Sequence, residues 1–203
     1  VCIRPNAAIP LLIPIISTRS DWSPLKVMAL LNKAGADLAA TAIAQATVSA
    51  SPPIAARLIR LLVSLHSPCA LPIIRQLMNE QKPTDDVIAA SLSFFGECSD
   101  LRDLAVVRAH LTHPTWYIRV QAATALGKVG LKEDEARLID LLGDTFWWVR
   151  YRAAEALSNL PSMTEAKLAE IHATLPTIES QEVIMPFLTK LRAKKTVAVL
   201  PAA

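Results

Sequence analysis

Apolar positions between residues 133 and 160 recur with the period of an α-helix and are interrupted by a turn. In residues 133–142, and again in residues 147–160, most apolar side chains follow one another at helical spacing, which gathers them on one side of a helix. Gly143 and Asp144 separate the two segments, and Asp144 suits the N-cap of the second helix because its carboxylate can accept from unpaired backbone amides. The pattern predicts two antiparallel helices joined by a short turn.

This two-helix pattern recurs at a fixed spacing. Residues 116–130 and 147–161 match at an offset of 31 positions, the distance between their first tryptophans. A fixed period of about 20–50 residues is typical of proteins built from stacked repeats. The paired alanines fit such a stack, because small side chains let the helices of neighbouring repeats approach closely. The identical positions are Trp116 and Trp147, Arg119 and Arg150, Ala122 and Ala153, Ala123 and Ala154, Ala125 and Ala156, and Leu126 and Leu157.

Weaker copies extend the pattern in both directions along the chain. Pro83 and Gly96 stand one period before Pro114 and Gly127, although that earlier copy lacks the tryptophan and the arginine. We interpret each copy as a first helix followed by a second helix. The predicted helical segments are residues 24–33, 37–48, 53–65, 72–81, 83–96, 101–111, 116–129, 133–142, 147–160, 164–173 and 179–195.

We therefore expect an all-α fold, a right-handed α-solenoid of about five antiparallel helix pairs. A single array is predicted over residues 24–195, with its clearest repeats at 100–130 and 131–161 and a frayed tail at 196–203. Residues 1–23 are interpreted either as a capping helix or as the remnant of an anchor. Their apolar run is shorter than the roughly 20 residues that a membrane span needs.

Composition and charge change this picture little. The net charge of +3 and the isoelectric point near 8.9 are too mild to indicate nucleic acid as the partner. Three widely spaced cysteines without a Cys-x-x-Cys motif predict neither a disulfide framework nor a zinc site. A glycine-rich phosphate loop and a nucleophile paired with histidine are also missing from the sequence. We therefore expect no enzymatic activity, no cofactor and no metal.

The segments 116–126 and 144–157 resemble the HEAT-repeat family, and more narrowly the HEAT-like repeats of phycobiliprotein lyases and of bacterial scaffold proteins. The resemblance rests on the residues shared by the two copies, together with Pro114 and Asp144. It implies that the repeated arginine bonds to acidic or carbonyl groups in the turn of an adjacent repeat, where a planar guanidinium can satisfy several acceptors. His113 stands one period before Asp144. Structural positions between repeats are therefore assigned to Trp116, Arg119, Asp144, Trp147 and Arg150.

Aromatic and arginine side chains also gather where the second helices begin. Both types are enriched at the energetic centres of protein interfaces, and the same types can hold nucleic-acid bases and phosphates. Helical spacing places several of them on one exposed ridge, away from the apolar side. The residues predicted to bind a partner are Tyr117, Gln121, Trp148, Tyr151, Arg152 and Glu155.

The function that these observations favour is a non-enzymatic scaffold or adaptor that binds a protein partner on the concave face of the array. A cytoplasmic location is expected, with membrane association possible through an N-terminal anchor. Two alternatives stay open. The first is a tetrapyrrole (bilin) lyase or a lyase subunit, which the resemblance alone suggests. The second is a DNA-binding or DNA-repair protein, against which Asp144 and Glu155 interrupt the positive charge.

Overall fold

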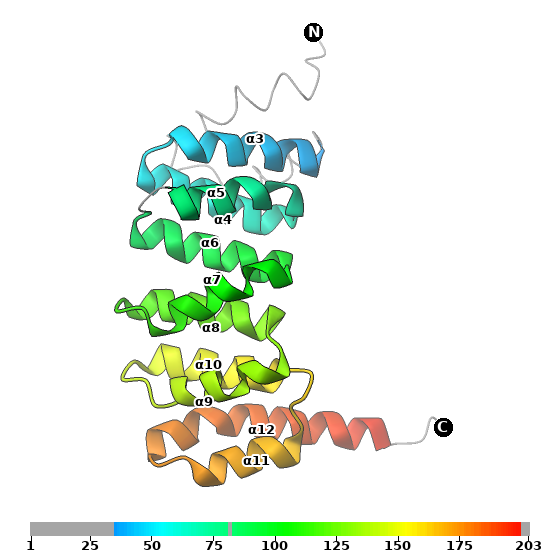
Figure 1. The fold of residues 1–203 in the computed structure, drawn as a ribbon. Coiled ribbons are helices and arrows are strands. Elements are labelled where there is room, and N and C mark those ends of the chain that lie inside the picture. Colours follow the sequence, from blue (N-terminus) through cyan, green and yellow to red (C-terminus); the bar gives the residue numbers. More distant parts are fainter. Residues whose placement is uncertain (1–34, 81–82, 200–203) are drawn as a thin grey trace, which may run out of the picture. The chain divides into compact units, whose positions relative to one another are not determined.

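The computed structural model describes residues 35–80 and 83–199, and within these ranges every regular element is a helix (Figure 1). The all-α prediction is therefore confirmed. The described residues fall into two compact units, with the boundary after Cys98, and each unit is considered by itself. The predicted N-terminal segment 1–23, the predicted helix 24–33 and residues 200–203 of the predicted tail lie outside the described residues.

The first unit contains two pairs of helices. Helix α3 (Ala36–Ser49) packs against α4 (Pro52–Leu65), and α5 (Leu71–Glu80) packs against α6 (Asp85–Cys98). The second helices α4 and α6 also pack against each other, so their apolar faces share one core. Its largest fully buried side chains are Ile43, Leu58, Ile59, Leu62, Ile74, Leu92, Phe94 and Phe95.

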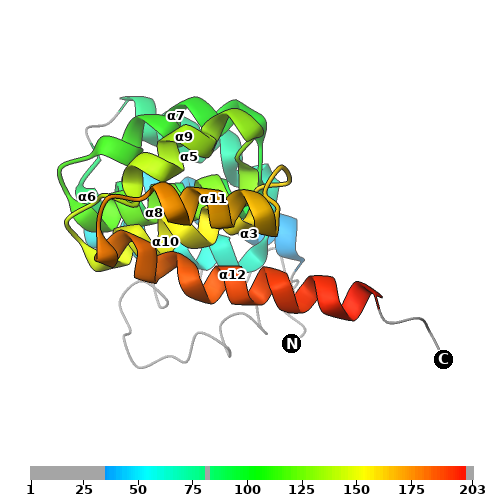
Figure 2. The ribbon, with the colours of Figure 1, turned by 90° about the horizontal axis from the view of Figure 1, so that it is seen from below.

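The second unit contains three pairs of helices. The pairs are α7 (Leu104–Ala109) with α8 (Trp116–Val129), α9 (Glu135–Leu141) with α10 (Trp147–Asn159), and α11 (Glu165–Thr174) with α12 (Ile178–Val199). Helix α10 packs on both α8 and α12. Viewed along the stack, the first helices α7, α9 and α11 lie on one side of the unit and the second helices on the other (Figure 2).

Most predicted helix boundaries differ little from the observed ones, but the first helices α7 and α9 of the second unit are shorter than predicted. The segment 101–111 is helix α7 flanked by the 3-10 turns Leu101–Asp103 and His110–Thr112. A third such turn, Lys132–Asp134, precedes α9. Helix α12 extends to Val199, beyond the predicted end at residue 195, and contains Pro186 in its interior.

Small residues make the contact between α8 and α10 possible. The three repeated alanines of each helix are buried, and the two helices approach closely beside Gly127, near the end of α8. A Cβ added to Gly127 would lie 2.8 Å from both the Cα and the Cβ of Ala156. Because one of these atoms is backbone, a rotamer change cannot relieve the overlap.

Replacing Gly127 with alanine should therefore destabilise the protein, although Gly→Ala inside a helix normally stabilises it. We expect Gly127→Ala to lower the free energy of unfolding by about 1–3 kcal/mol, the usual cost of overpacking a tight contact. Urea denaturation followed by circular dichroism measures this. Gly143→Ala is the matched control, because a Cβ there meets only the Asp140 carbonyl oxygen at 3.4 Å. Equal stability of the two variants would contradict the proposed tight contact.

Candidate protein-interaction surface

The turn before α8 is joined to the turn before α10 through Arg119. Its Nε and Nη2 donate to the two carboxylate oxygens of Asp144, at 2.7 and 2.9 Å. Its Nη1 donates to the backbone carbonyls of His113 and Pro114, at 2.8 and 3.0 Å. One guanidinium therefore closes its own turn and holds the next one, and only 12% of the Arg119 side chain is exposed.

The same turn geometry recurs in the next two repeats. Nη1 of Arg150 donates to the carbonyls of Asp144 and Thr145, at 2.8 and 3.2 Å. In the last repeat, Nε2 of Gln181 donates to the carbonyl of Leu175 at 2.9 Å. Each donor lies six residues after its main acceptor. The guanidinium or amide at this position therefore donates to backbone carbonyls that an irregular turn would leave without a hydrogen bond.

Asp144 does not occupy the N-cap position that the sequence predicts for it. The N-cap of α10 is Phe146, and Asp144 stands two residues earlier, where its Oδ1 accepts from the Phe146 amide at 2.9 Å. His113 has the same role one repeat before, because its Nδ1 accepts from the Thr115 amide at 3.1 Å. An imidazole can thus replace the carboxylate in holding the turn.

A second ion pair joins the first helices of these two repeats. Nε and Nη2 of Arg108 donate to the carboxylate of Asp134, at 2.6 and 2.8 Å, and the Leu131 amide donates to the same carboxylate. Burial acts to raise the pKa of Asp134. The hydrogen bonds from Arg108 and Leu131, together with the charges of Arg108 and Arg137, outweigh this effect and hold the pKa below its ordinary value of 3.8.

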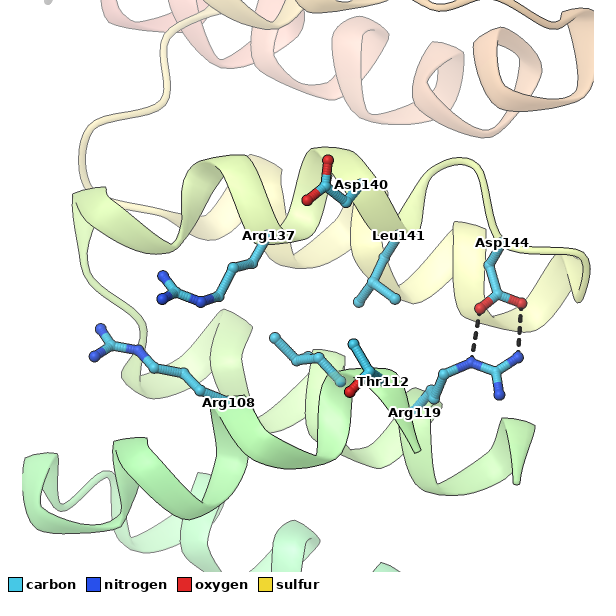
Figure 3. A pocket seen from close by; sticks show the side chains of 8 residues that line it. Arg108, Thr112, Arg119, Arg137, Asp140, Leu141 and Asp144 are labelled. Carbon is cyan, nitrogen blue, oxygen red and sulfur yellow. Dashed lines mark hydrogen bonds and ion pairs between the residues drawn. The ribbon is translucent and has the colours of Figure 1, made fainter. Parts of the chain in front are cut away.

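A cavity of about 340 Å³ lies beside these ion pairs (Figure 3). Its centre is apolar, and arginine side chains stand at both ends. Since Arg108 and Arg119 are already bonded to Asp134 and Asp144, the cavity offers little free positive charge, and we assign it no ligand. It is lined by Arg108, Leu111, Thr112, Arg119, Arg137, Asp140, Leu141 and Asp144.

Aromatic rings cover the surface where α8 and α10 begin. Trp116 stacks on Phe146, with ring centroids 5.6 Å apart, and the guanidinium of Arg119 lies 5.6 Å from the Phe146 ring. On α10, Trp147 stacks on Tyr151 at 5.1 Å and meets Trp148 edge-on at 4.7 Å. We call these five rings, Trp116, Phe146, Trp147, Trp148 and Tyr151, the aromatic cluster.

The cluster lies largely at the surface. Phe146, Trp147 and Trp148 are 45%, 48% and 52% exposed, and Trp116 is 36% exposed. Both repeated tryptophans are thus more exposed than a side chain that only fills the space between repeats. Phe146 is absent from the sequence-based candidates because Thr115 stands one period earlier. Its position next to two tryptophans was the available signal.

The remaining candidates surround the cluster to different degrees. Arg152 pairs with Glu155 at 2.6 Å, and its guanidinium lies 5.8 Å from the Tyr151 ring. Tyr117 meets Trp116 edge-on at 5.9 Å. Gln121 is half-buried on α8, and its side chain has no hydrogen bond within residues 35–80 and 83–199. Among the residues predicted to bind a partner, Gln121 is the one whose side chain makes no hydrogen bond, ion pair or ring contact within the described ranges.

The two ion pairs of this surface should differ sharply in their contribution to stability. Asp144→Asn should lower the free energy of unfolding by about 2–4 kcal/mol, since it leaves the largely buried Arg119 without its counter-charge. Glu155→Gln should cost less than about 1 kcal/mol, because its pair with Arg152 lies at the surface. The side chains of Arg152 and Glu155 are 37% and 34% exposed. Chemical denaturation of the two variants measures the difference. Similar losses in both would contradict the structural role of Asp144.

The lowered pKa of Asp134 predicts how stability depends on pH. A carboxyl whose pKa is lower in the folded state stabilises fully above its unfolded value and loses that contribution as the pH falls through the folded value. Asp134→Asn should therefore lower the melting temperature at neutral pH, and the gap from the wild type should narrow as the pH falls below about 4. Thermal unfolding over this range measures the gap. A gap of constant size would contradict the assignment.

Two further kinds of site are absent from the part of the chain that the structure describes. None of its helices has the length and apolar character needed to cross a membrane. Within the same residues, no group of three or more histidine, cysteine or acidic side chains is arranged to hold a metal ion.

Comparison with known proteins agrees with this architecture. A family model described as HEAT repeats matches residues 104–177, which include α7 to α11. The match is to HEAT repeats in general and does not extend to the narrower phycobiliprotein-lyase type. A search of curated proteins finds no match to the chain. The fold is an all-α, HEAT-like stack of helix pairs, and its residues 104–177 match the HEAT-repeat family.

Proposed function

We propose that this chain is a scaffold or adaptor that binds a protein partner on the face of the second helices, at the aromatic cluster. Protein interaction is the typical role of HEAT repeats, which supports the general class. The observation that carries the location is the exposure of Phe146, Trp147 and Trp148, each close to half accessible to solvent. Exposed aromatic groups of this size are characteristic of binding sites, and tryptophan is among the residues that contribute most to binding energy.

The surroundings of the cluster suit a protein interface. Interfaces commonly combine an apolar centre with a polar rim, and arginine is enriched in them. Here Arg152 and Glu155 stand beside Tyr151, and Arg119 lies against Phe146. The charges of Arg152 and Glu155 remain partly available to a partner, because this pair is only partly buried.

The surface is also held in place before a partner arrives. Arg119 fixes the turn that carries Phe146, and Arg150 fixes the turn that precedes Trp147. Ordering loops on binding costs free energy, so a surface whose turns are already bonded loses less on association. We expect binding with little backbone movement. The predicted role of Trp116, Arg119, Asp144, Trp147 and Arg150 thus extends from joining repeats to supporting this surface.

The proposal is tested by affinity capture and reconstitution. Wild-type protein and the double variant Trp148→Ala/Arg152→Glu are used to capture proteins from the source cell, and a protein lost by the variant is then purified and its Kd measured. We expect the variant to weaken that Kd at least about tenfold, since truncating a central aromatic side chain commonly costs more than 1 kcal/mol. Glu170→Ala, an exposed position on the first helix α11, is the matched control and should bind like the wild type.

Circular dichroism should first show equal helix content in all three proteins. Equal affinity of wild type and double variant for every captured protein would exclude this surface as the binding site. Capture of nucleic acid with a steep salt dependence would favour the DNA-binding alternative. Capture of bilin carriers followed by chromophore transfer would favour the lyase alternative.

A further inference from the structure

In the second unit, one face of each second helix packs on the second helix of the next repeat. Gly127 of α8 lies close to Ala156 of α10, and the ring of Tyr151 on α10 contacts the ring of Phe187 on α12, with centroids 5.3 Å apart. At the centre of this face of α10, Ala154 is fully buried. The face is therefore covered wherever a further repeat follows.

The corresponding face of α12 carries no helix among the described residues. When the stack is viewed from this end, α12 lies at the front and no helix of the second unit covers it (Figure 2). One period after Trp147 and Ala154 the chain carries Ile178 and Met185, which are 70% and 44% exposed. Terminal repeats of such stacks usually have a polar outer face. Two exposed apolar side chains at these positions therefore indicate a surface that a further helix can cover.

The residues of this face follow a regular spacing along α12. They are separated by four, three, four and three positions, which is typical of helices that pair along their length, because this spacing keeps one stripe directed at the partner helix. All of them are exposed. We call them the α12 stripe: Ile178, Glu182, Met185, Thr189 and Arg192.

The charges of the α12 stripe complement those of a second copy of the same helix. Glu182 lies near the start of the stripe and Arg192 at its end. In an antiparallel pair with a two-fold axis between Met185 and Thr189, Glu182 of each copy lies opposite Arg192 of the other. A parallel pair would instead place like charges opposite each other. The Nε of Arg192 bonds to Glu165 of α11, yet 59% of the Arg192 side chain is exposed and accessible to a second copy.

We propose that two copies of this chain associate through the α12 stripe as an antiparallel helix pair. Burial of Ile178 and Met185 against the second copy supplies the favourable free energy. The two ion pairs between Glu182 and the second copy's Arg192 fix the direction and the register. This inference goes beyond the proposed function and does not rest on it, because the stripe belongs to α12 and the aromatic cluster to α8, α10 and the turn between them.

Sedimentation equilibrium of the full chain over a wide range of concentrations tests the association. We expect the mass to rise from the 22.0 kDa of one chain toward twice that value. Met185→Asp should weaken the dimer Kd about tenfold or more, because it places a charge at the apolar centre of the pair. Asn159→Asp, at an exposed position of α10, adds the same charge away from the stripe and is the matched control. A monomeric wild type, or equal dimerisation of the two variants, would overturn the proposal.

Exchange of the two charges tests the antiparallel arrangement. Glu182→Arg and Arg192→Glu should each weaken the dimer, since each places like charges opposite one another. An equimolar mixture of these two variants should form a heterodimer, because every opposed pair then again has opposite charges. The double variant Glu182→Arg/Arg192→Glu should recover a Kd within about threefold of the wild type. Circular dichroism should first show equal helix content in all variants. Full dimerisation of either single variant, or no recovery in the mixture and the double variant, would overturn the antiparallel pairing.

Discussion

The second unit depends on one repeated interaction, a planar donor that bonds to the carbonyls of the turn before its own helix. Arg119, Arg150 and Gln181 each reach back six residues to do this. A tight turn between two helices leaves carbonyls without partners, and burying them unpaired would be costly. With the turn fixed in this way, each second helix begins at the same place relative to its first helix, and the alanines of successive helices can meet at close range.

The same interaction explains why aromatic rings stand at the surface. With its guanidinium directed into the turn, the helix presents its first residues, Trp116 and Trp147, at the edge of the repeat. There their contacts depend on which side chains the turn of the next repeat carries. Phe146 stacks on Trp116, whereas Trp147 turns to Tyr151 of its own helix and stays half exposed. The binding surface that we propose thus follows from the same hydrogen bonds that fix the turns of the stack.

Departures from the repeat are as informative as the repeat itself. His113 replaces Asp144 in capping the turn amide, because an imidazole nitrogen can accept that bond. Leu175, one period after Asp144, has no acceptor in its side chain, and the buried Nε of Arg150 has no hydrogen-bond partner among the described residues. A repeat protein needs identical contacts only where they support the stack.

The sequence by itself determined the fold class, the helix pairs and the residues of the turns, because burial on one side of a helix imposes a period that can be counted along the chain. Trp116 and Arg119 recur as Trp147 and Arg150 for this reason. Only the tertiary structure decided that Phe146 joins the aromatic cluster and that Arg108 bonds to Asp134. Such contacts join side chains of different repeats. Their geometry depends on how closely the helices pack, and the sequence pattern of one repeat does not determine that distance.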